Sequence, residues 1–386
     1  MQSSLALEGS KLSNPERVLV LITKMDRGGA ETMSMNYYRH FDRTKVQYDF
    51  MVNRQEPGDY EDEIKHLGGR IFRMCPMYPQ YFSRYKHEFK EFLEAHPEYR
   101  IIHSNLEERS YFPLKVASKM HVPVRIAHAH NEYPGFDLKT PMRYYFKKRL
   151  PPYMTQGFSC SQSAGNWLYG KKLMQSGKIS TIKNAIDLQQ YQYSDTRRKS
   201  MRAMLSIPDD EFVIGNVGRF AVQKNQTFLL DVFSEIHKHH PNTSLLLVGD
   251  GDLHKELETK VKKLGLSNAV RFTGIVSDSW DFLQAMDVFV MPSLHEGLPL
   301  ALVEAQASGL PCVVSDVVSS ESDVTGRIEF VPLSSPLDEW SKTIMRFAVK
   351  TDEEARGLVN LSDTGFDINV EAPKLQKYYL DSVSRA

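Results

Sequence analysis

Cysteine is scarce in this chain, and long apolar runs are missing. The 386 residues include Cys75, Cys160 and Cys312, an odd and scattered set that fits neither a disulfide framework nor a zinc site. No stretch approaches the ~20 apolar residues of a membrane-spanning helix, and the polar residues 1–16 lack the apolar core of a signal peptide. We therefore expect a cytoplasmic protein without disulfides or membrane spans, whose residues 1–16 form a flexible tail.

The chain also lacks a net charge, although its charges are unevenly distributed. Residues 1–190 contain 28 Lys and Arg against 20 Asp and Glu, and the remainder contains 20 against 28. Opposite charge in the two halves suggests two domains with different partners. Chance scatter on a solvated surface is the alternative, because charge alone does not specify a partner.

Short apolar runs alternate with helix-length amphipathic segments along most of the chain. A first series of predicted strands lies near 18–23, 48–52, 70–73, 100–103, 124–128, 157–160 and 179–182, and a second near 212–217, 244–248, 270–273, 288–291 and 312–315. Strands that alternate with helices indicate parallel βαβ units with helices on both faces of a sheet. The sequence therefore predicts an α/β chain with two doubly wound, Rossmann-like domains that face a central cleft.

The polar, helix-poor stretch Asn184–Asp195 is the best candidate for the connection between these domains. We place the N-terminal domain at 17–187 and the C-terminal domain at 188–365. In a doubly wound sheet, ligands lie beyond the carboxyl ends of the strands, where the strand order reverses. With the common order 3-2-1-4-5, functional residues are expected after strand 1 or strand 4 of a domain.

Two cations follow the first strand of the C-terminal domain. The segment Gly218-Arg219-Phe-Ala-Val-Gln-Lys224-Asn225 precedes a predicted helix at 226–239. Arginine supplies a planar fork of donors, lysine a compact charge and the helix N-terminus free N–H groups, so the loop suits a diphosphate. Either residue alone is more often a surface charge.

A second loop follows the fourth strand of the same domain. It reads His295-Glu296-Gly297-Leu298-Pro299 and leads into a predicted helix at 301–308 that carries Glu304. Pro299 fits the first helical turn, and Gly297 permits the close approach of a ligand. Two acids at this spacing are common, so their position after strand 4, opposite the Arg/Lys loop, is the stronger signal.

These motifs resemble those of the retaining GT-B glycosyltransferases of family 4. The resemblance rests on the two loops, on Asn184-Ala185-Ile186-Asp187, where the family has Asn-Gly-Ile/Val-Asp, and on Gly249-Asp250-Gly251 and Phe272-Thr273-Gly274. We interpret Gly249-Asp250-Gly251 mainly as a tight turn. The chain is similar to the family from about Arg17 onward, and most similar to enzymes of bacterial capsule and exopolysaccharide assembly.

The resemblance implies a role for each matched residue of the C-terminal domain. Arg219 and Lys224 would hold the donor diphosphate, and Glu296 would contact hydroxyls of the transferred sugar. Glu304 would bind the ribose. The remaining donor-binding candidates would contribute backbone contacts to the base or sugar, or shape the loops: Gly218, Asn225, Thr273, Gly274, Ile275, His295, Gly297, Leu298 and Pro299.

The N-terminal domain carries candidates at the same edge of its sheet. Gly28-Gly29 follows the first strand, either as a strand-to-helix turn or, as the resemblance implies, near the donor phosphates and acceptor. His128 and His130 lie on one face where the fifth strand ends. The resemblance implies a histidine close to the reacting sugar, and we prefer His130 as catalytic, with His128 second. The candidate acceptor residues are His103, Asn105, His128 and Asn131, with Asn105 standing where many relatives have a second histidine.

Aromatic and basic residues gather in two further stretches, Tyr78–Lys86 and Lys139–Arg149. Basic helices with aromatic faces can lie on an anionic membrane, so we expect peripheral contact with the inner face of the plasma membrane. Packing against the core is the alternative, and nucleic acid is not expected as a partner, because no recognition motif is present. From the resemblance, a C-terminal helix within 366–386 is expected to cross back to the N-terminal domain.

Together these features predict a hexosyltransferase, and the resemblance implies that it retains the anomeric configuration of the donor. A UDP-sugar, preferred over a GDP-sugar, would be the donor, and a lipid-linked or growing oligosaccharide the acceptor. We recognise no Asp-x-Asp cluster that suggests a divalent cation, so neither a metal nor another cofactor is expected, and Arg219, Lys224 and a helix N-terminus would stabilise the leaving diphosphate. Two alternatives stay open: a UDP-sugar epimerase of the same architecture and a non-catalytic nucleotide-sugar-binding subunit.

Overall fold

The computed structural model describes residues 14–131, 140–276, 278–296, 298–349, 356 and 361–385. It divides the chain into two compact units, one formed by residues 1–182 and 369–386 and the other by residues 183–368. Most of the predicted tail at 1–16 lies outside the described residues, as do Lys139 and Gly297. Each unit is described by itself.

A seven-stranded parallel sheet in the order β3-β2-β1-β4-β5-β6-β7 forms the centre of the first unit. The last five residues of β1 are all buried, as expected of a parallel strand covered on both faces. The strands are β1 (Glu16–Ile22), β2 (Val46–Val52), β3 (Ile71–Arg73), β4 (Ile101–Ser104), β5 (Val124–Ala129), β6 (Gln156–Ser159) and β7 (Ile179–Thr181).

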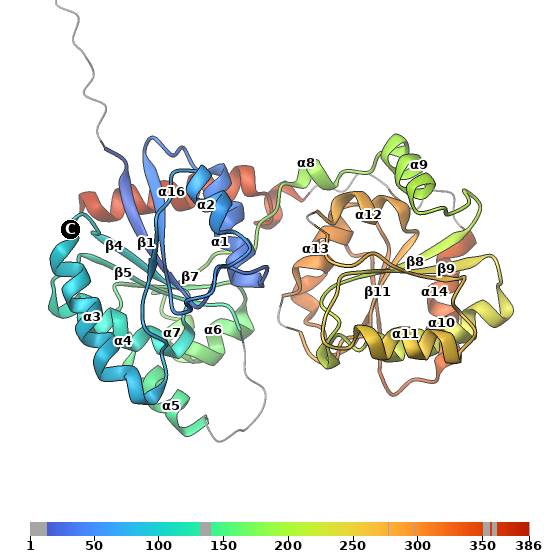
Figure 1. Cartoon of the computed structure of the whole chain (residues 1–386), viewed down its shortest axis with the longest axis horizontal. Coiled ribbons are helices and arrows are strands. Elements are labelled where there is room, and N and C mark those ends of the chain that lie inside the picture. Colours follow the sequence, from blue (N-terminus) through green and yellow to red (C-terminus); the bar gives the residue numbers. More distant parts are fainter. Residues whose placement is uncertain are drawn as a thin grey trace, which may run out of the picture. The chain divides into compact units, whose positions relative to one another are not determined.

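Helices cover both faces of this sheet (Figure 1). One face carries α1 (Gly29–His40), α2 (Glu61–His66) and the C-terminal α16 (Ile368–Ser384), and the other carries α3 (Phe82–Ala95), α4 (Tyr111–Lys119), α5 (Thr140–Arg149), α6 (Gln162–Tyr169) and α7 (Lys171–Met174). On α16, Ala372, Leu375, Tyr379 and Val383 are buried at helical spacing, so the helix packs an apolar stripe against the sheet.

The second unit is built on a six-stranded parallel sheet in the order β10-β9-β8-β11-β12-β13. Its strands are β8 (Phe212–Val217), β9 (Thr243–Val248), β10 (Val270–Phe272), β11 (Val288–Met291), β12 (Cys312–Ser315) and β13 (Ile328–Val331). Its helices are α8 (Leu188–Tyr191), α9 (Asp195–Met204), α10 (Gln226–His239), α11 (His254–Lys263), α12 (Trp280–Ala285), α13 (Leu300–Ala307) and α14 (Leu337–Met345). Separate apolar cores lie on the two faces, one beneath α10, α11 and α14 and the other beneath α9, α12 and α13.

The predicted fold class and strand order are confirmed, and three local expectations are corrected. β13 was not predicted, because its alternating, partly exposed residues include Glu329. The supposedly helix-poor connection contains α8, which Asp187 caps by accepting from the backbone N–H of Gln189. Pro299 is the residue before α13 rather than part of its first turn.

Candidate functional site

In the second unit, the loops that follow β8 and β11 lie side by side because these strands pair in parallel. The backbone N–H of Leu294 donates to the carbonyl of Gln223 at 2.8 Å, and the Gln223 side chain donates to the carbonyl of His295 at 3.0 Å. The Asn225 side chain donates to the carbonyl of Pro292 at 3.1 Å. These bonds join the two loops predicted to hold the donor.

Lys224 and Glu296, one from each loop, form an ion pair. The Lys224 ammonium lies 2.7 Å from Oε1 of Glu296, and the two side chains are 22% and 6% exposed. The phosphate cation and the sugar-binding acid inferred from the sequence therefore neutralise each other in this structure. A phosphate that binds Lys224 would compete with the Glu296 carboxylate for the charge of the ammonium.

Arg219 lies in the same loop but does not join this pair. Its guanidinium donates to Asp252 at 2.8 Å, and both side chains are largely exposed. The buried Gln226 donates to the Arg219 carbonyl at 3.1 Å, and this bond fixes the backbone of the loop. The side chain of Arg219 extends into solvent. A surface pair of this kind contributes little to stability, so Arg219 is available for a ligand at small cost.

The helix α10 begins where these cations lie. Asn225 precedes it in the left-handed conformation, with φ of 56°, which asparagine tolerates better than most residues. Among the described residues no side chain caps this terminus. The helix therefore presents backbone N–H groups and the positive end of its dipole beside Lys224, an arrangement that suits an anion.

Glu304 lies on α13, eight residues after Glu296, and its hydrogen-bond partners differ from those of the Lys224–Glu296 pair. The hydroxyl of Ser279 donates to Oε2 of Glu304 at 2.8 Å. Burial raises the pKa of Glu304, and the hydrogen bonds from Ser279 and Tyr191 oppose that rise. A carboxylate so fixed can accept hydrogen bonds from a vicinal diol such as ribose. The sequence argument found Glu304 but not Ser279 or Tyr191.

Gly249-Asp250-Gly251 is more than a tight turn. A side chain at Gly249, where φ is 137°, would bring its Cβ within 2.2 Å of the Gly218 carbonyl, and one at Gly251 would meet the Phe220 carbonyl at 2.5 Å. The N–H of Gly249 also donates to the carbonyl of Gly274. These glycines therefore let the turn press against both the Arg219 loop and the segment 273–275.

The other donor candidates differ in exposure. Ile275 is 75% exposed beside Thr273 and Gly274, so an apolar side chain is open to a base. His295 is exposed, whereas Pro299 is buried and Leu298 packs on the core. Gly297 lies outside the described residues.

Asp250-Gly251-Asp252 has the Asp-x-Asp spacing, which the sequence argument did not weigh as a site for a divalent cation. Asp250 accepts from Nδ1 of His254 at 2.7 Å and from the N–H of Gly251, while Asp252 pairs with Arg219. Across the described residues, no group of three or more His, Cys, Asp or Glu side chains is placed to hold a metal ion.

In the first unit, Gly28 caps α1 and Gly29 begins it, after a loop of residues 23–27 that follows β1. Neither has a positive φ, and a Cβ on Gly29 would meet nothing within 4 Å, so the fold itself does not require this glycine. The nearest atoms to a Cβ on Gly28 would be those of the flexible carboxylate of Glu31. Burial raises the pKa of Glu31 to about 7, and the sequence argument did not single this residue out.

Three histidines gather at the carboxyl end of β4 and β5. Nε2 of His103 lies 3.0 Å from Nδ1 of His128, and the ring centroids of His128 and His130 are 4.1 Å apart. Burial lowers the pKa of His103 and of His130 to about 3 and places that of His128 well below its ordinary value. These rings are therefore neutral near pH 7 and can each donate and accept one hydrogen bond.

The two asparagines of the predicted acceptor set have different partners. Asn105 accepts from Nε2 of His130 at 2.8 Å, whereas Asn131 donates to Glu107 from both its backbone and its side chain. Glu107 also accepts from the N–H of His130, and burial raises the pKa of Glu107 to about 8. Glu107 is a residue that sequence reasoning missed, although its position just after β4 was the available signal.

The described part of the predicted membrane-binding segment forms α5. Phe146 is buried, while Tyr144 and Tyr145 are 48% and 50% exposed. The Arg149 guanidinium lies over the Tyr145 ring at 4.5 Å, and the Lys147 ammonium lies over Tyr144 at 4.5 Å. Within the described ranges no helix combines the length and apolar character needed to cross a bilayer.

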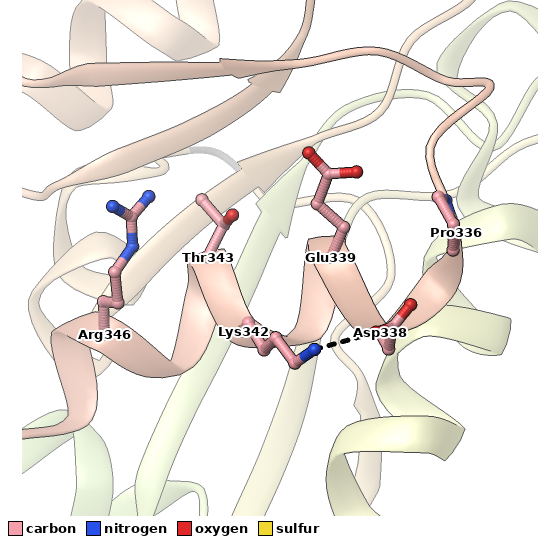
Figure 2. A pocket seen from close by; sticks show the side chains of 6 residues that line it. All are labelled: Pro336, Asp338, Glu339, Lys342, Thr343 and Arg346. Carbon is pink, nitrogen blue, oxygen red and sulfur yellow. Dashed lines mark hydrogen bonds and ion pairs between the residues drawn. The ribbon is translucent and has the colours of Figure 1, made fainter.

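A pocket on the second unit lies apart from the predicted site residues. It is lined by α14, by Pro336 before it and by Arg346 in the 3-10 turn after it, and Figure 2 shows the Lys342–Asp338 ion pair among its side chains. The lining residues are Pro336, Asp338, Glu339, Lys342, Thr343 and Arg346.

Comparison with known proteins gives a consistent family for both units. Residues 27–190 match the family described as "Glycosyltransferase Family 4", and residues 197–329 match that described as "Glycosyl transferases group 1". EpsF of Bacillus subtilis (strain 168), which is named as an inferred glycosyltransferase, is 34% identical over 340 residues, covering 87% of this chain and 88% of EpsF.

Two further relatives are named glycosyltransferases, and a solved structure has the same fold. The capsular polysaccharide biosynthesis glycosyltransferase CapH of Staphylococcus aureus is 23% identical over 94% of this chain and 98% of its own. The UDP-Gal:alpha-D-GlcNAc-diphosphoundecaprenol alpha-1,3-galactosyltransferase of Escherichia coli is 30% identical over 53% of this chain and 55% of its own. The crystal structure of Anabaena Alr3699/HepE with UDP and glucose has the same fold, with a TM-score of 0.76, 20% identity and coverage of 95% of this chain and 100% of that one. The chain belongs to the GT-B glycosyltransferases of family 4.

Proposed function

We propose that this glycosyltransferase transfers a hexosyl unit from a UDP-sugar to a lipid-linked or growing glycan in polysaccharide biosynthesis, with retention of anomeric configuration. The observation that carries the proposal is the Lys224–Glu296 ion pair, which joins the two loops after β8 and β11. The similarity to a capsular polysaccharide enzyme supports the pathway, and the similarity to a diphosphoundecaprenol galactosyltransferase supports a lipid-linked acceptor.

Donor binding would exchange the partners of this ion pair. The diphosphate would take Lys224, helped by Arg219 and by the N-terminus of α10, and Glu296 would then be free to accept hydrogen bonds from sugar hydroxyls. The leaving diphosphate gains charge as the glycosidic bond breaks. Fixed cations and backbone dipoles stabilise that charge most where water is excluded, which is how these residues would lower the barrier.

The diphosphate site supplies its own positive charge, so we propose that transfer needs no divalent metal. Arg219, Lys224 and the α10 terminus provide what a metal would provide elsewhere. Full activity after removal of divalent cations with EDTA is the expected result. Activity that EDTA abolishes and Mg²⁺ or Mn²⁺ restores would contradict this part of the proposal.

On the first unit, we propose that His130 faces the reacting sugar and that Gly28 and Gly29 approach the donor phosphates. Open space at Gly29 and the unpaired Nδ1 of His130 support these roles. The exposed tyrosines and flanking cations of α5 suit the headgroup region of an anionic membrane. We therefore propose that this helix contacts the inner face of the plasma membrane. Sedimentation with vesicles that contain anionic lipid, compared with neutral vesicles, tests this contact, and equal binding to both would contradict it.

A donor panel tests the proposed function. Thermal shift and hydrolysis are measured with UDP- and GDP-hexoses, and UDP release is then followed with and without a lipid diphosphate sugar acceptor. We expect UDP to raise the Tm of the protein and the release of UDP to depend on the acceptor. The new glycosidic bond should have the same anomeric configuration as the donor. Conversion of the UDP-sugar to its epimer without an acceptor, or binding with no turnover, would instead favour one of the two alternatives.

A further inference from the structure

A chain of buried hydrogen bonds crosses the first unit. The hydroxyls of Tyr48 on β2 and Tyr379 on α16 lie 2.7 Å apart, and the Tyr379 hydroxyl lies 2.7 Å from Nδ1 of His103 on β4. Nε2 of His103 lies 3.0 Å from Nδ1 of His128 on β5. All four side chains are less than 5% exposed, so bulk water does not compete for these protons.

Each link in this chain carries one proton, which allows two polarities. A tyrosine hydroxyl and a neutral imidazole each donate one hydrogen bond and accept another. In the first polarity Tyr48 donates to Tyr379, Tyr379 donates to Nδ1 of His103, and the Nε2–H of His103 donates to His128. In the second polarity every donor and acceptor is exchanged, so that His103 carries its proton on Nδ1.

The two ends of the chain decide between these polarities. Nε2 of His128 is buried and, among the described residues, has no partner. In the first polarity this Nε2–H is the one unsatisfied group, because Tyr48 donates to Tyr379. In the second polarity Nε2 of His128 remains unpaired, and the Tyr48 proton also has no acceptor within the described structure. Buried polar groups without partners are costly, so the first polarity is the more stable.

The ring next to His128 completes the pattern. Nε2 of His130 donates to Oδ1 of Asn105, so the His130 proton is on Nε2 and its Nδ1 is an acceptor. This Nδ1 is also buried without a partner in the described part of the chain. The first polarity therefore leaves a donor on His128 and an acceptor on His130, in rings whose centroids are 4.1 Å apart.

We infer that Tyr379 is a positioning residue that keeps the proton of His103 on Nε2 and thereby presents a donor on His128 next to an acceptor on His130. A substrate hydroxyl, which accepts one hydrogen bond and donates another, matches the polarity of these two atoms and would have to displace the groups that bury them. The C-terminal helix then forms part of a hydroxyl-recognition site, although Tyr379 follows His103 by 276 positions. The match to a sugar hydroxyl rests on the proposed function, whereas the position of the proton does not.

Nitrogen NMR of the full-length protein, labelled at its histidines, tests the position of the proton. The method distinguishes protonated from unprotonated ring nitrogens, and His103→Asn and His128→Asn variants assign the signals. The wild type should carry the His103 proton on Nε2. Tyr379→Phe removes the donor to Nδ1 and should distribute the proton over both nitrogens, whereas Tyr48→Phe should leave it on Nε2.

Tyr378→Phe is the matched control on the same helix, since the Tyr378 ring packs on Phe158 and lies outside the hydrogen-bond chain. It should leave the His103 signals unchanged. A wild-type proton on Nδ1, or an unchanged His103 in Tyr379→Phe, would overturn the inference.

Transfer kinetics test the link to the substrate. In Tyr379→Phe we expect kcat to fall about tenfold with the donor KM unchanged, while Tyr378→Phe keeps the wild-type kcat. If Tyr379→Phe moves the His103 proton away from Nε2 but leaves kcat unchanged, the assignment of His128 and His130 to a reacting substrate is overturned. A wild-type protein without transferase activity would refute the proposed function, and the NMR experiment would still decide the role of Tyr379.

Discussion

Replacing Glu296 by glutamine should tighten the binding of UDP while slowing the transfer of sugar. UDP carries the diphosphate but no hexose, so it competes with Glu296 for Lys224 and gains nothing from Glu296 itself. In the wild type, Glu296 already holds the Lys224 ammonium in a 2.7 Å ion pair, so the diphosphate has to compete with the carboxylate for that charge. The Glu296→Gln variant removes that competition and keeps a side chain of the same size.

The size of the effect follows from the environment of the pair. Two unit charges about 4 Å apart attract by about 4 kcal/mol at an effective dielectric constant of about 20. Glu296 is 6% exposed but Lys224 is 22% exposed, so solvent screening reduces the net contribution. We expect a coupling of about 1.4 kcal/mol, which corresponds to an approximately tenfold lower Kd for UDP.

Isothermal titration with UDP at fixed ionic strength measures this change. Asp252→Asn is the matched control, because it removes the carboxylate that pairs with Arg219 in the same loop, where both side chains are largely exposed. That variant should change the Kd by less than about twofold. A Kd for Glu296→Gln that equals or exceeds that of the wild type would refute the exchange of partners.

The lysine variant completes the experiment. Lys224→Ala should weaken UDP binding and reduce turnover about 100-fold, or about 3 kcal/mol, through lost stabilisation of the diphosphate. It also leaves Glu296 buried without its cation, so the free energy of unfolding should fall, and Lys224→Ala/Glu296→Gln should recover part of it. Near wild-type turnover in Lys224→Ala would contradict the proposed donor site.

Three further predictions concern separate parts of the molecule. Glu304→Ala should mainly raise the donor KM with little change in kcat, and an unchanged KM in steady-state assays would remove Glu304 from the ribose. Because burial raises the pKa of Glu107 from 4.5 to about 8, the folded state holds a proton that the unfolded state releases, so stability should fall as pH rises between these values. Glu107→Gln should remove the contribution of Glu107 to that decline, at most about 1.4 kcal/mol per pH unit, in denaturant titrations from pH 5 to pH 8. Parallel curves for the two proteins would contradict it. Gly249→Ala should lower Tm more than Gly265→Ala. Both glycines have positive φ, but only a Cβ at Gly249 would meet a carbonyl, that of Gly218. Equal losses of Tm would show that backbone conformation alone sets the cost.

The fold was largely predictable because each element carries its own signal. Buried parallel strands such as β8 and β11 are continuous apolar runs, and the predicted bounds of both agree with the structure. β13 escaped because an edge strand has one open side and keeps polar residues such as Glu329. The helix α8 is only four residues long, too short for a periodic pattern.

The candidate site was predictable in position but not in its partners. Residues after strand 1 and strand 4 could be placed at one edge of a sheet, because strand order alone brings those loops together. The contact between Lys224 and Glu296 spans 72 positions, and that between Tyr379 and His103 spans 276. Such contacts depend on side-chain packing across the whole unit, for which a single sequence carries no local signal.

The two groups of candidate residues differ in what a ligand has to do. In the second unit the charged candidates already satisfy one another, since Lys224 holds Glu296 and Arg219 holds Asp252. A nucleotide sugar bound there, as proposed, would exchange ion pairs, and its affinity should fall as salt rises. In the first unit the neutral rings of His128 and His130 leave buried atoms unpaired within the described structure, so a hydroxyl would add hydrogen bonds and displace none. Recognition at the histidines should consequently be nearly independent of salt, and this difference allows binding at the two units to be separated by titration at low and high ionic strength.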